Sequence, residues 1–332
     1  MRARPYSSDF LGSMFEKLRH LLADNQIMLV LLALVAGMMF PAVFLPIAPY
    51  TTAMLMLIFF TSSLRLEASE LFAYAKDWKM LLIANISMLI LMPIALWFPL
   101  AAFAPEWALA FLIVGAMPTG LTIALIADMF GGKQSLAMLI SATTSILAPI
   151  TVPLILSLVV GRSVDIPVLN LFGSLFLTIV VPFVLAMATK REFKPFVQKH
   201  DLMWREVSLL FFALLVAAIT ANSMHGDTIT LSWMDAGIVL VLTVFMGGIA
   251  WVSAAATSWR SPAERITIAL CMVYMNNTLA LYIGDKFFAN QHIVPKLLII
   301  LTAVNLLLPP IKFAASKILK TTKPSTIANP VL

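Results

Sequence analysis

Long apolar segments without charged residues constrain the fold of this chain more than any other feature. Of its 332 residues, 61% are hydrophobic and 11% are charged, whereas a soluble domain carries roughly 25% charged residues. Several segments reach the roughly 20 apolar residues that a helix needs to cross a bilayer. None alternates apolar and polar residues like an outer-membrane strand. The sequence therefore predicts an all-α polytopic membrane protein whose helices satisfy their own backbone groups within the lipid bilayer.

Hydropathy predicts ten spans, and the basic residues predict their orientation. All of the 22 lysines and arginines except Arg162, Lys286 and Lys296 fall in segments that share one face if both termini are cytoplasmic. Because basic residues favour the cytoplasmic side, we expect this orientation, in a plasma membrane of the bacterial inner-membrane type. The predicted spans are residues 27–46, 50–65, 79–103, 107–129, 134–160, 168–189, 206–223, 233–257, 264–288 and 293–316.

The chain is predicted to have four parts. Residues 1–26 carry apolar residues at helical spacing, which favours an amphipathic cytoplasmic segment on the membrane surface or a solvated tail helix. Residues 27–160 and 161–316 are the two predicted five-helix repeats, and residues 317–332 form a cytoplasmic tail. Since five spans is an odd number, the repeats must be inverted relative to each other, which is a common transporter arrangement.

Short sequence matches support this duplication. The segment Thr122-Ile-Ala-Leu125 corresponds to Thr278-Leu-Ala-Leu281, and Ser145-Ile-Leu-Ala-Pro149 corresponds to Asn305-Leu-Leu-Leu-Pro309. Each match alone is short. Their shared order and nearly constant separation favour one duplication.

Two predicted spans contain residues that interrupt a helix in the middle of the membrane. Span 107–129 contains Gly115-Ala-Met-Pro118-Thr119-Gly120, and span 264–288 contains Tyr274-Met-Asn276-Asn277-Thr278 at the corresponding place. Proline breaks the helical hydrogen-bond ladder, and adjacent asparagines in mid-bilayer are costly unless they bind something. Interrupted spans at matching positions of two halves are the best sequence pointer to a transport site. A proline kink and an interhelical asparagine contact are the alternative interpretation.

Hydroxyl groups of span 134–160 are predicted to face the same place. Ser141, Thr144 and Ser145 share one helical face, and Asn305 corresponds to Ser145 in the second half. The alternative is that these hydroxyls bond back to their own helix. Half-helix N-termini suit an anion, and freed carbonyl and hydroxyl oxygens suit a small cation. The sequence therefore predicts a secondary transporter.

Missing residue patterns disfavour other functions. No carboxylate lies at a predicted span centre, and neither a nucleophile–base pair nor a glycine-rich phosphate loop is present. We therefore expect neither an enzyme nor an ATP-driven pump. The net charge of +6 is explained by membrane orientation, so no nucleic-acid partner is expected. The single cysteine, Cys271, belongs to no Cys/His metal cluster, and no cofactor is expected besides sodium.

Three short motifs resemble the bile acid:sodium symporter family, within the superfamily that includes arsenite exporters and riboflavin transporters. Pro118-Thr119-Gly120 stands where that family has a Pro-Gly-Gly type turn. Thr144-Ser145-Ile-Leu-Ala-Pro149 stands where it has a Ser-Thr-Leu-Leu-Ser-Pro type run. Met275-Asn276-Asn277-Thr278 stands where it has Met-Gln-Asn-Ser. The resemblance covers nearly the whole chain.

The resemblance implies a panel domain from spans 1, 2, 6 and 7 and a core domain from spans 3–5 and 8–10. Spans 4 and 9 would be broken and would cross in the core. It also implies symport of an organic anion with sodium, by alternating access. The expected substrate-binding residues are Thr119, Gly120, Asn277, Thr278 and Asn305. The expected ion-binding residues are Thr122, Ser141, Thr144, Ser145 and Asn276.

The sequence departs from the family at three places that bear on sodium. Met272 stands where the family has a ligating Glu, Ile123-Ala124 where it has Ser-Asn, and Met88 where it has Gln. Losing the carboxylate removes the charge that offsets the desolvation of a bound cation, so neutral oxygens alone would bind sodium more weakly. We therefore expect an organic-anion carrier with weakened sodium coupling. We also expect it to be monomeric. A metalloid or oxyanion exporter of the same superfamily and a non-transporting membrane receptor are the alternatives.

Overall fold

The computed structural model describes residues 26–66, 77–120, 122–161, 164–224 and 232–306. Over these residues the chain is helical, and its only strand-like feature is one isolated bridge. The predicted all-α fold is confirmed, whereas residues 1–25 and the predicted tail 317–332 lie outside the described residues. The helices of the first half are α2 (Gln26–Met39), α3 (Pro41–Phe44), η1 (Leu45–Tyr50), α4 (Thr51–Leu64), α6 (Trp78–Ile86), η2 (Ser87–Leu91), α7 (Met92–Phe103), α8 (Pro105–Ala116), α9 (Ile123–Met129) and α10 (Gln134–Val160).

The second half is also helical. Its elements are α11 (Val168–Leu175), η3 (Phe176–Val180), α12 (Val181–Glu192), α13 (Lys194–Lys199), α14 (Asp201–Met224), α15 (Trp233–Ala256), α16 (Pro262–Val273), α17 (Asn277–Phe287), η4 (Ala289–Gln291) and a final helix, Val294–Leu306.

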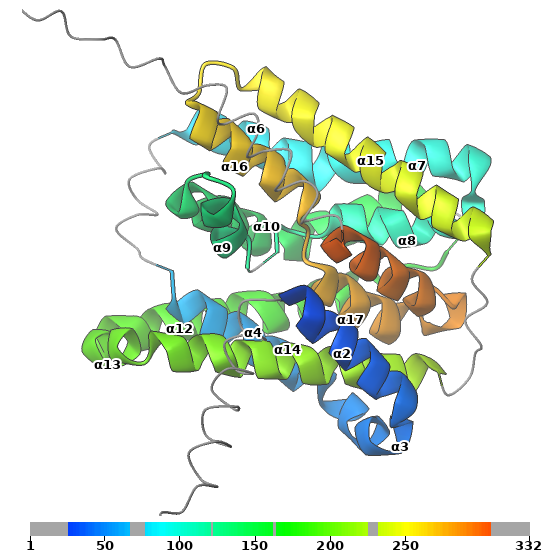
Figure 1. Cartoon of the computed structure of the whole chain (residues 1–332), viewed down its shortest axis with the longest axis horizontal. Helices are drawn as coiled ribbons and strands as arrows, with labels where there is room; N and C mark the ends of the chain where they lie inside the picture. The colour runs from blue at the N-terminus through cyan, green and yellow to red at the C-terminus, as the bar shows by residue number, and fades with distance from the viewer. Residues whose placement is uncertain (1–25, 67–76, 121, 162–163, 225–231, 307–332) are drawn as a thin grey trace, which may run out of the picture.

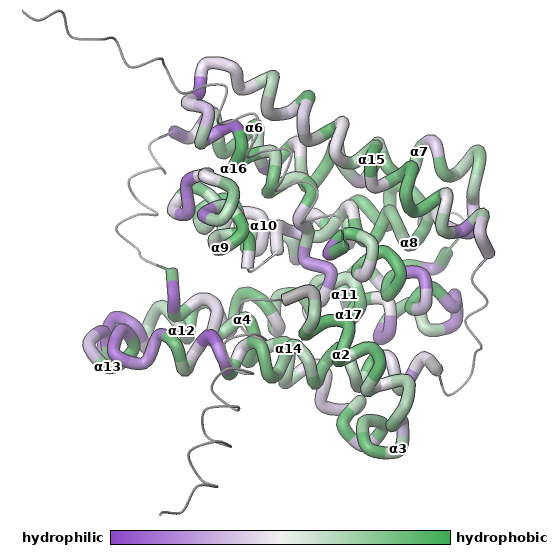
Figure 2. The backbone as a smooth tube through the Cα atoms, viewed as in Figure 1, coloured by the Kyte–Doolittle hydropathy of each residue, from purple (hydrophilic) through white to green (hydrophobic). Residues whose placement is uncertain are grey.

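Six helical segments among the described residues are long and apolar enough to cross a membrane. They match the second, third and fifth to eighth predicted spans. Figure 2 shows hydrophobic residues along these helices and hydrophilic residues gathered at their ends and on α13. The six segments are Pro41–Leu64, Trp78–Phe103, Gln134–Val160, Val168–Glu192, Asp201–Ser223 and Trp233–Ser253.

The first predicted span, 27–46, is wrong at its C-terminal end. The helix α2 stops at Met39, and Phe40 leaves the helical region with φ −125° and ψ 52°. Pro41 explains the break, because the ring of a proline disfavours helical geometry at the preceding residue. Residues 41–50 continue instead into α4, as one segment from Pro41 to Leu64.

Two helices contain a π-helical turn, and a proline explains each one. The turn η2 precedes Pro93, and η3 precedes Pro182. A proline inside a helix removes one backbone donor, and its ring clashes with the carbonyl four residues earlier. The chain widens there, and Met92 N–H bonds to Ser87 O, five residues back. Both segments therefore stay helical across the membrane.

The helices form two layers, which Figure 1 shows one above the other. The α14 layer consists of α2–α4 and α11–α14, in which α14 packs against α2 and α4, and α12 packs against α4. The α15 layer consists of α6–α10, α15–α17 and the final helix, in which α15 packs against α16, and α7 against α8. The layers meet where α17 packs against α4 and α14, and where α10 packs against α11.

The helices give the molecule two distinct ends. The Arg65 end carries Arg65 at the end of α4, Asp201 at the start of α14 and Lys133 before α10. The Lys286 end carries Lys286 in the last turn of α17 and Asn222 near the end of α14. Each end therefore contains residues from both layers.

Candidate functional site

The two helix breaks predicted from the sequence are present. α8 ends at Ala116, Met117 is extended with ψ 146°, and α9 begins at Ile123. α16 ends at Val273, and α17 begins at Asn277. Each predicted span is thus a pair of half-helices joined by a few unwound residues.

The two unwound segments cross and bond to each other through their backbones. Thr119 and Met275 form the isolated antiparallel bridge. Gly120 N–H donates to Tyr274 O at 2.9 Å, and Asn276 N–H donates to Pro118 O at 2.8 Å. The two bonds are reciprocal: adding 156 to positions 118 and 120 gives 274 and 276, so each bond is the counterpart of the other.

Thr119 is fully buried and anchors the crossing. Its Oγ1 donates to Met88 Sδ at 3.2 Å and to Cys271 O at 3.4 Å, and its N–H donates to Thr144 Oγ1 at 3.3 Å. Its side chain therefore contacts the core of the α15 layer, and Thr119 does not line either pocket described below.

Gly120 is required by close packing at the crossing. A Cβ atom at this position would lie 2.8 Å from two ring carbons of Tyr274. Any other residue would therefore push Tyr274 or the crossing backbone aside. The same glycine lines the space beside the crossing.

Of the α10 hydroxyls, some bond back to their own helix and others face the crossing, so each of the two interpretations from the sequence holds for part of them. Thr144 Oγ1 donates to Ile140 O at 2.7 Å, which is a bond within its own helix. Ser141 Oγ donates to Thr119 O at 3.4 Å and thus reaches the crossing. Ser145 Oγ is buried and has no hydrogen-bond partner among the described residues.

Three buried asparagines beside the crossing have unpartnered polar atoms. Asn276 Oδ1 accepts from Leu279 N–H at 3.0 Å and so caps α17, while its Nδ2 has no partner among the described residues. The Oδ1 atoms of Asn277 and Asn305 also have none. Because buried polar groups are normally bonded, these three atoms are available to a ligand or to water.

Two adjoining pockets lie between the layers. The crossing pocket holds the asparagines and is lined by Ile58, Ser62, Gly120, Thr122, Ser208, Leu209, Phe212, Tyr274, Met275, Asn276, Asn277, Thr278, Leu301 and Asn305. The Arg65 pocket opens toward the Arg65 end. It is lined by Phe59, Ser62, Ser63, Arg65, Leu66, Thr122, Ile123, Ala124, Gln134, Met138, Ser141, Ala142, Ser145, Ile179, Phe183, Arg205, Ser208 and Leu209.

The structure thus gathers most of the predicted site residues around these two adjoining pockets. Gly120, Asn276, Asn277, Thr278 and Asn305 line the crossing pocket, Ser141 and Ser145 line the Arg65 pocket, and Thr122 lines both. Thr144 lies behind the crossing and lines neither pocket. The assigned roles of these residues in binding a substrate or an ion stay predictions.

Sequence reasoning missed the wall that the α14 layer contributes. Ser62 and Ser208 line both pockets, and their hydroxyl oxygens lie 3.2 Å apart. Arg65 and Arg205 line the Arg65 pocket, and none of the described residues that line either pocket is acidic. A serine three residues from an arginine, Ser62 before Arg65 and Ser208 after Arg205, was the signal in the sequence.

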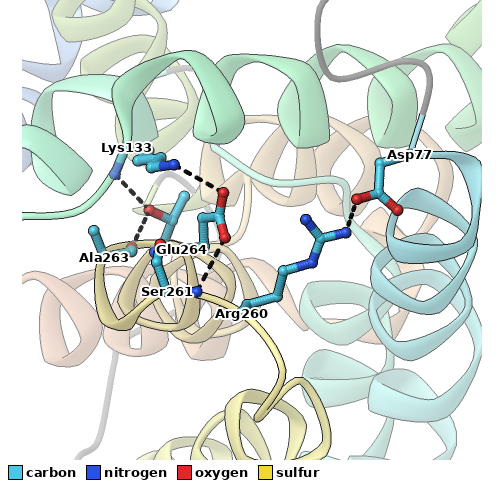
Figure 3. Close-up of polar contacts among 7 residues, drawn as sticks. Asp77, Lys133, Arg260, Ser261, Ala263 and Glu264 are labelled. Atoms are coloured by element: carbon cyan, nitrogen blue, oxygen red, sulfur yellow. Dashed lines mark hydrogen bonds and ion pairs between the residues drawn. The ribbon is translucent and has the colours of Figure 1, made fainter.

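Charged residues fix the half-helices α9 and α16 at the Arg65 end. Lys133 Nζ donates to Glu264 Oε1 at 2.8 Å, and Glu264 also accepts from Ser261 N–H in a capping box that starts α16. Arg260 pairs with Asp77, the N-cap of α6 (Figure 3). All of these contacts join elements of the α15 layer.

Cys271 is buried in the last turn of α16, just before the break between α16 and α17, and it lines neither pocket. Among the described residues, no group of three or more His, Cys, Asp and Glu side chains could hold a metal ion.

Comparison with known families gives one match that spans most of the chain. The model of the SBF-like CPA transporter family matches residues 24–320. A search of curated proteins gives no match. The family match confirms the resemblance to bile acid:sodium symporters that the sequence motifs indicate.

Proposed function

The chain belongs to the SBF-like CPA transporter family, and from this premise we propose that it is a secondary carrier of a small or amphipathic organic anion. The observation that carries the proposal is the crossing of two broken helices beside buried, unpartnered asparagine atoms. Broken helices at the repeat interface form the binding sites of many secondary transporters. The chain is an integral membrane protein of a transporter family, and an enzymatic role is not proposed.

The pockets favour an anionic cargo. Arg205 and Arg65, which also pairs with Asp201, line the Arg65 pocket and give it a basic wall. α17 begins at the crossing, so the positive end of its dipole lies beside the crossing pocket. A negatively charged head group near the arginines and an apolar body against Ile58, Phe212 and Leu301 would satisfy both parts of the space.

Sodium would meet only uncharged oxygen atoms here. Ser145 Oγ, Asn277 Oδ1 and Asn305 Oδ1 are buried and have no hydrogen-bond partner among the described residues, so they fit the oxygen ligands that a small cation prefers. Asn276 Oδ1 is occupied by the cap of α17, and Thr144 Oγ1 by backbone groups. Without a carboxylate to offset desolvation, the proposed carrier should depend on a sodium gradient less than one with an acidic ligand.

The bridge pairs Thr119 with Met275, which have the same separation as the matched Thr122 and Thr278, and this supports an inverted ten-span repeat. A twofold axis in the membrane plane would exchange the two unwound segments and would convert each bond into the other. In this proposal the α14 layer is the panel, the α15 layer is the core, and the core rocks against the panel in alternating access. The Arg65 end, which carries most of the basic residues that the structure describes, faces the cytoplasm.

The test is uptake of a panel of organic anions into proteoliposomes, with and without a sodium gradient. Asn277→Ala should abolish uptake, because it removes the Oδ1 atom that lines the crossing pocket without a partner in the protein. Asn85→Ala is the matched control, since Asn85 is a buried asparagine of the α15 layer that lines neither pocket. Full uptake by Asn277→Ala would refute the assignment of the site.

A further inference from the structure

Three polar residues of α17 join the two layers at the Lys286 end. Tyr282, Asp285 and Lys286 lie within two turns of α17, which belongs to the α15 layer. Each of them bonds to a side chain of the α14 layer. We use the name α17 latch for these three residues together with their partners Thr52, Ser174 and Asn222.

Lys286 is the centre of the α17 latch. Its ammonium group donates to Tyr282 Oη at 2.7 Å, to Ser174 Oγ at 3.2 Å and to Thr52 Oγ1 at 3.4 Å. These are all three of the bonds that a lysine can donate. The buried Tyr282 hydroxyl also lies 2.8 Å from Ser174 Oγ and 3.1 Å from Thr52 Oγ1. The cluster therefore connects α17 to α4 and α11 at once.

Asp285 makes a second connection, to another helix of the α14 layer. Its Oδ1 accepts from Asn222 Nδ2 at 2.8 Å. Neighbouring residues of α17 thus hold three helices of the opposite layer: α4 and α11 through Lys286, and α14 through Asp285.

The polar contacts at the Arg65 end have a different arrangement. Arg65 pairs with Asp201 inside the α14 layer, and Lys133 pairs with Glu264 inside the α15 layer. The Arg65 pocket lies between the layers at this end, with walls from both. The α17 latch therefore bonds the layers at the Lys286 end, beside an apolar groove between α2, α14, α15 and the final helix, and the Arg65 pocket lies between the layers at the other end.

We infer that the α17 latch is a gate: it closes the transport site toward the Lys286 end and must break before the site can open there. This inference rests on the proposed alternating-access function. The latch suits this task because its hydroxyl, ammonium and amide groups can all be hydrated when they separate. Such contacts hold a state by a small free energy and release without leaving a buried charge unpaired.

The experiment measures access to the interface behind the latch. Leu55 is fully buried on α4, one turn from Thr52 in the latch and one turn from Ile58 in the crossing pocket. Leu55→Cys, in a Cys271→Ala background, is labelled with a membrane-impermeant maleimide applied to the Lys286 face of sealed vesicles. Val216→Cys on α14, also fully buried, is the second reporter if Leu55→Cys does not fold.

Labelling should rise about tenfold in Tyr282→Phe and in Lys286→Met, which is the change in an opening equilibrium expected for the loss of about 1.4 kcal/mol. Lys296→Met is the matched control. It removes a lysine whose Nζ bonds to Glu106 O within the α15 layer, and labelling should not change.

Unchanged labelling in both latch variants, or an equal rise in Lys296→Met, would overturn the latch. The assay needs no substrate, so its outcome is independent of the uptake test. A failure of Asn277→Ala to abolish uptake would refute the proposed site and would leave the labelling result as it is.

Discussion

The two ends of the molecule hold the same helices by different means. At the Lys286 end, polar side chains of α17 cross from one layer to the other. At the Arg65 end, the Arg65–Asp201 and Lys133–Glu264 pairs each lie within one layer, and the Arg65 pocket lies between the layers. The comparison indicates that the ion pairs named here join elements of one layer, while contacts that water can replace join the surfaces that would have to separate.

Cross-linking the layers at the Lys286 end should have the largest effect. In Asn222→Cys/Asp285→Cys, a short cleavable methanethiosulfonate cross-linker should abolish proteoliposome uptake, because it makes the contact between α14 and α17 permanent. Reduction should restore uptake. The same treatment of Asp77→Cys/Arg260→Cys, a pair within the α15 layer, should leave uptake as it was before cross-linking. Uptake by the cross-linked first pair would show that the layers need not separate at this end.

Removing Glu264 should have the next largest effect, on stability rather than on motion. Glu264→Ala removes both the bond to Lys133 and one half of the capping box of α16. We expect a loss of about 1–3 kcal/mol in the free energy of unfolding, measured by thermal unfolding in detergent. Glu264→Gln keeps an acceptor for Ser261 N–H and should lose less. An equal loss in Glu264→Gln and Glu264→Ala would mean that the charge, and not the cap, holds α16.

The crossing lies between the two ends, and its asparagines should behave differently from each other. Asn276→Ala removes the cap of α17 and should lower the free energy of unfolding by about 1 kcal/mol, whereas Asn276→Ser keeps an acceptor and should be near neutral. Asn277→Ala should cost little stability, since its Oδ1 has no partner among the described residues. Equal losses in Asn276→Ala and Asn277→Ala would contradict this division of roles.

The smallest effect is expected for the ion pair inside the α14 layer. Arg65 and Asp201 lie 3.0 Å apart, but the Asp201 side chain is 51% exposed. Exposed pairs contribute roughly 0–1 kcal/mol and weaken with salt. Asp201→Asn should therefore shift thermal unfolding slightly, and the shift should fade at high ionic strength. A shift in thermal unfolding that persists in high salt would contradict this prediction and would show that the pair stabilises the α14 layer despite its exposure.

The sequence predicts the breaks and the residues around them because a proline and paired asparagines act locally. Pro118 and Asn276 are recognised by residue type, because each stands inside a segment that hydropathy alone predicts as one continuous span. The end of the first span was predicted wrongly, because Pro41 lies in an apolar run and hydropathy alone does not register a break there. The latch could not be predicted, since Tyr282, Asp285 and Lys286 are ordinary span-end residues until folding brings Thr52, Ser174 and Asn222 beside them.

Like the latch, the wall of serines and arginines in the α14 layer depends on contacts between helices that are distant in the chain. Ser62 and Ser208 belong to helices far apart in the chain, and only the packing of α4 against α14 turns them into one wall. Local patterns identify where a helix is interrupted. They do not identify which distant helix closes the space beside the interruption.

The crossing of the two broken helices is built from main-chain atoms, and this has a consequence for how such a site can evolve. The bonds from Gly120 to Tyr274 O and from Asn276 to Pro118 O require only peptide groups. Apart from Gly120, where a Cβ would meet the Tyr274 ring, and Asn276, which caps α17, side chains around the junction can therefore be exchanged without removing its bonds. A lineage can lose an acidic or amide ligand, and with it an old cargo or driving ion, while it inherits the framework on which a new specificity is selected.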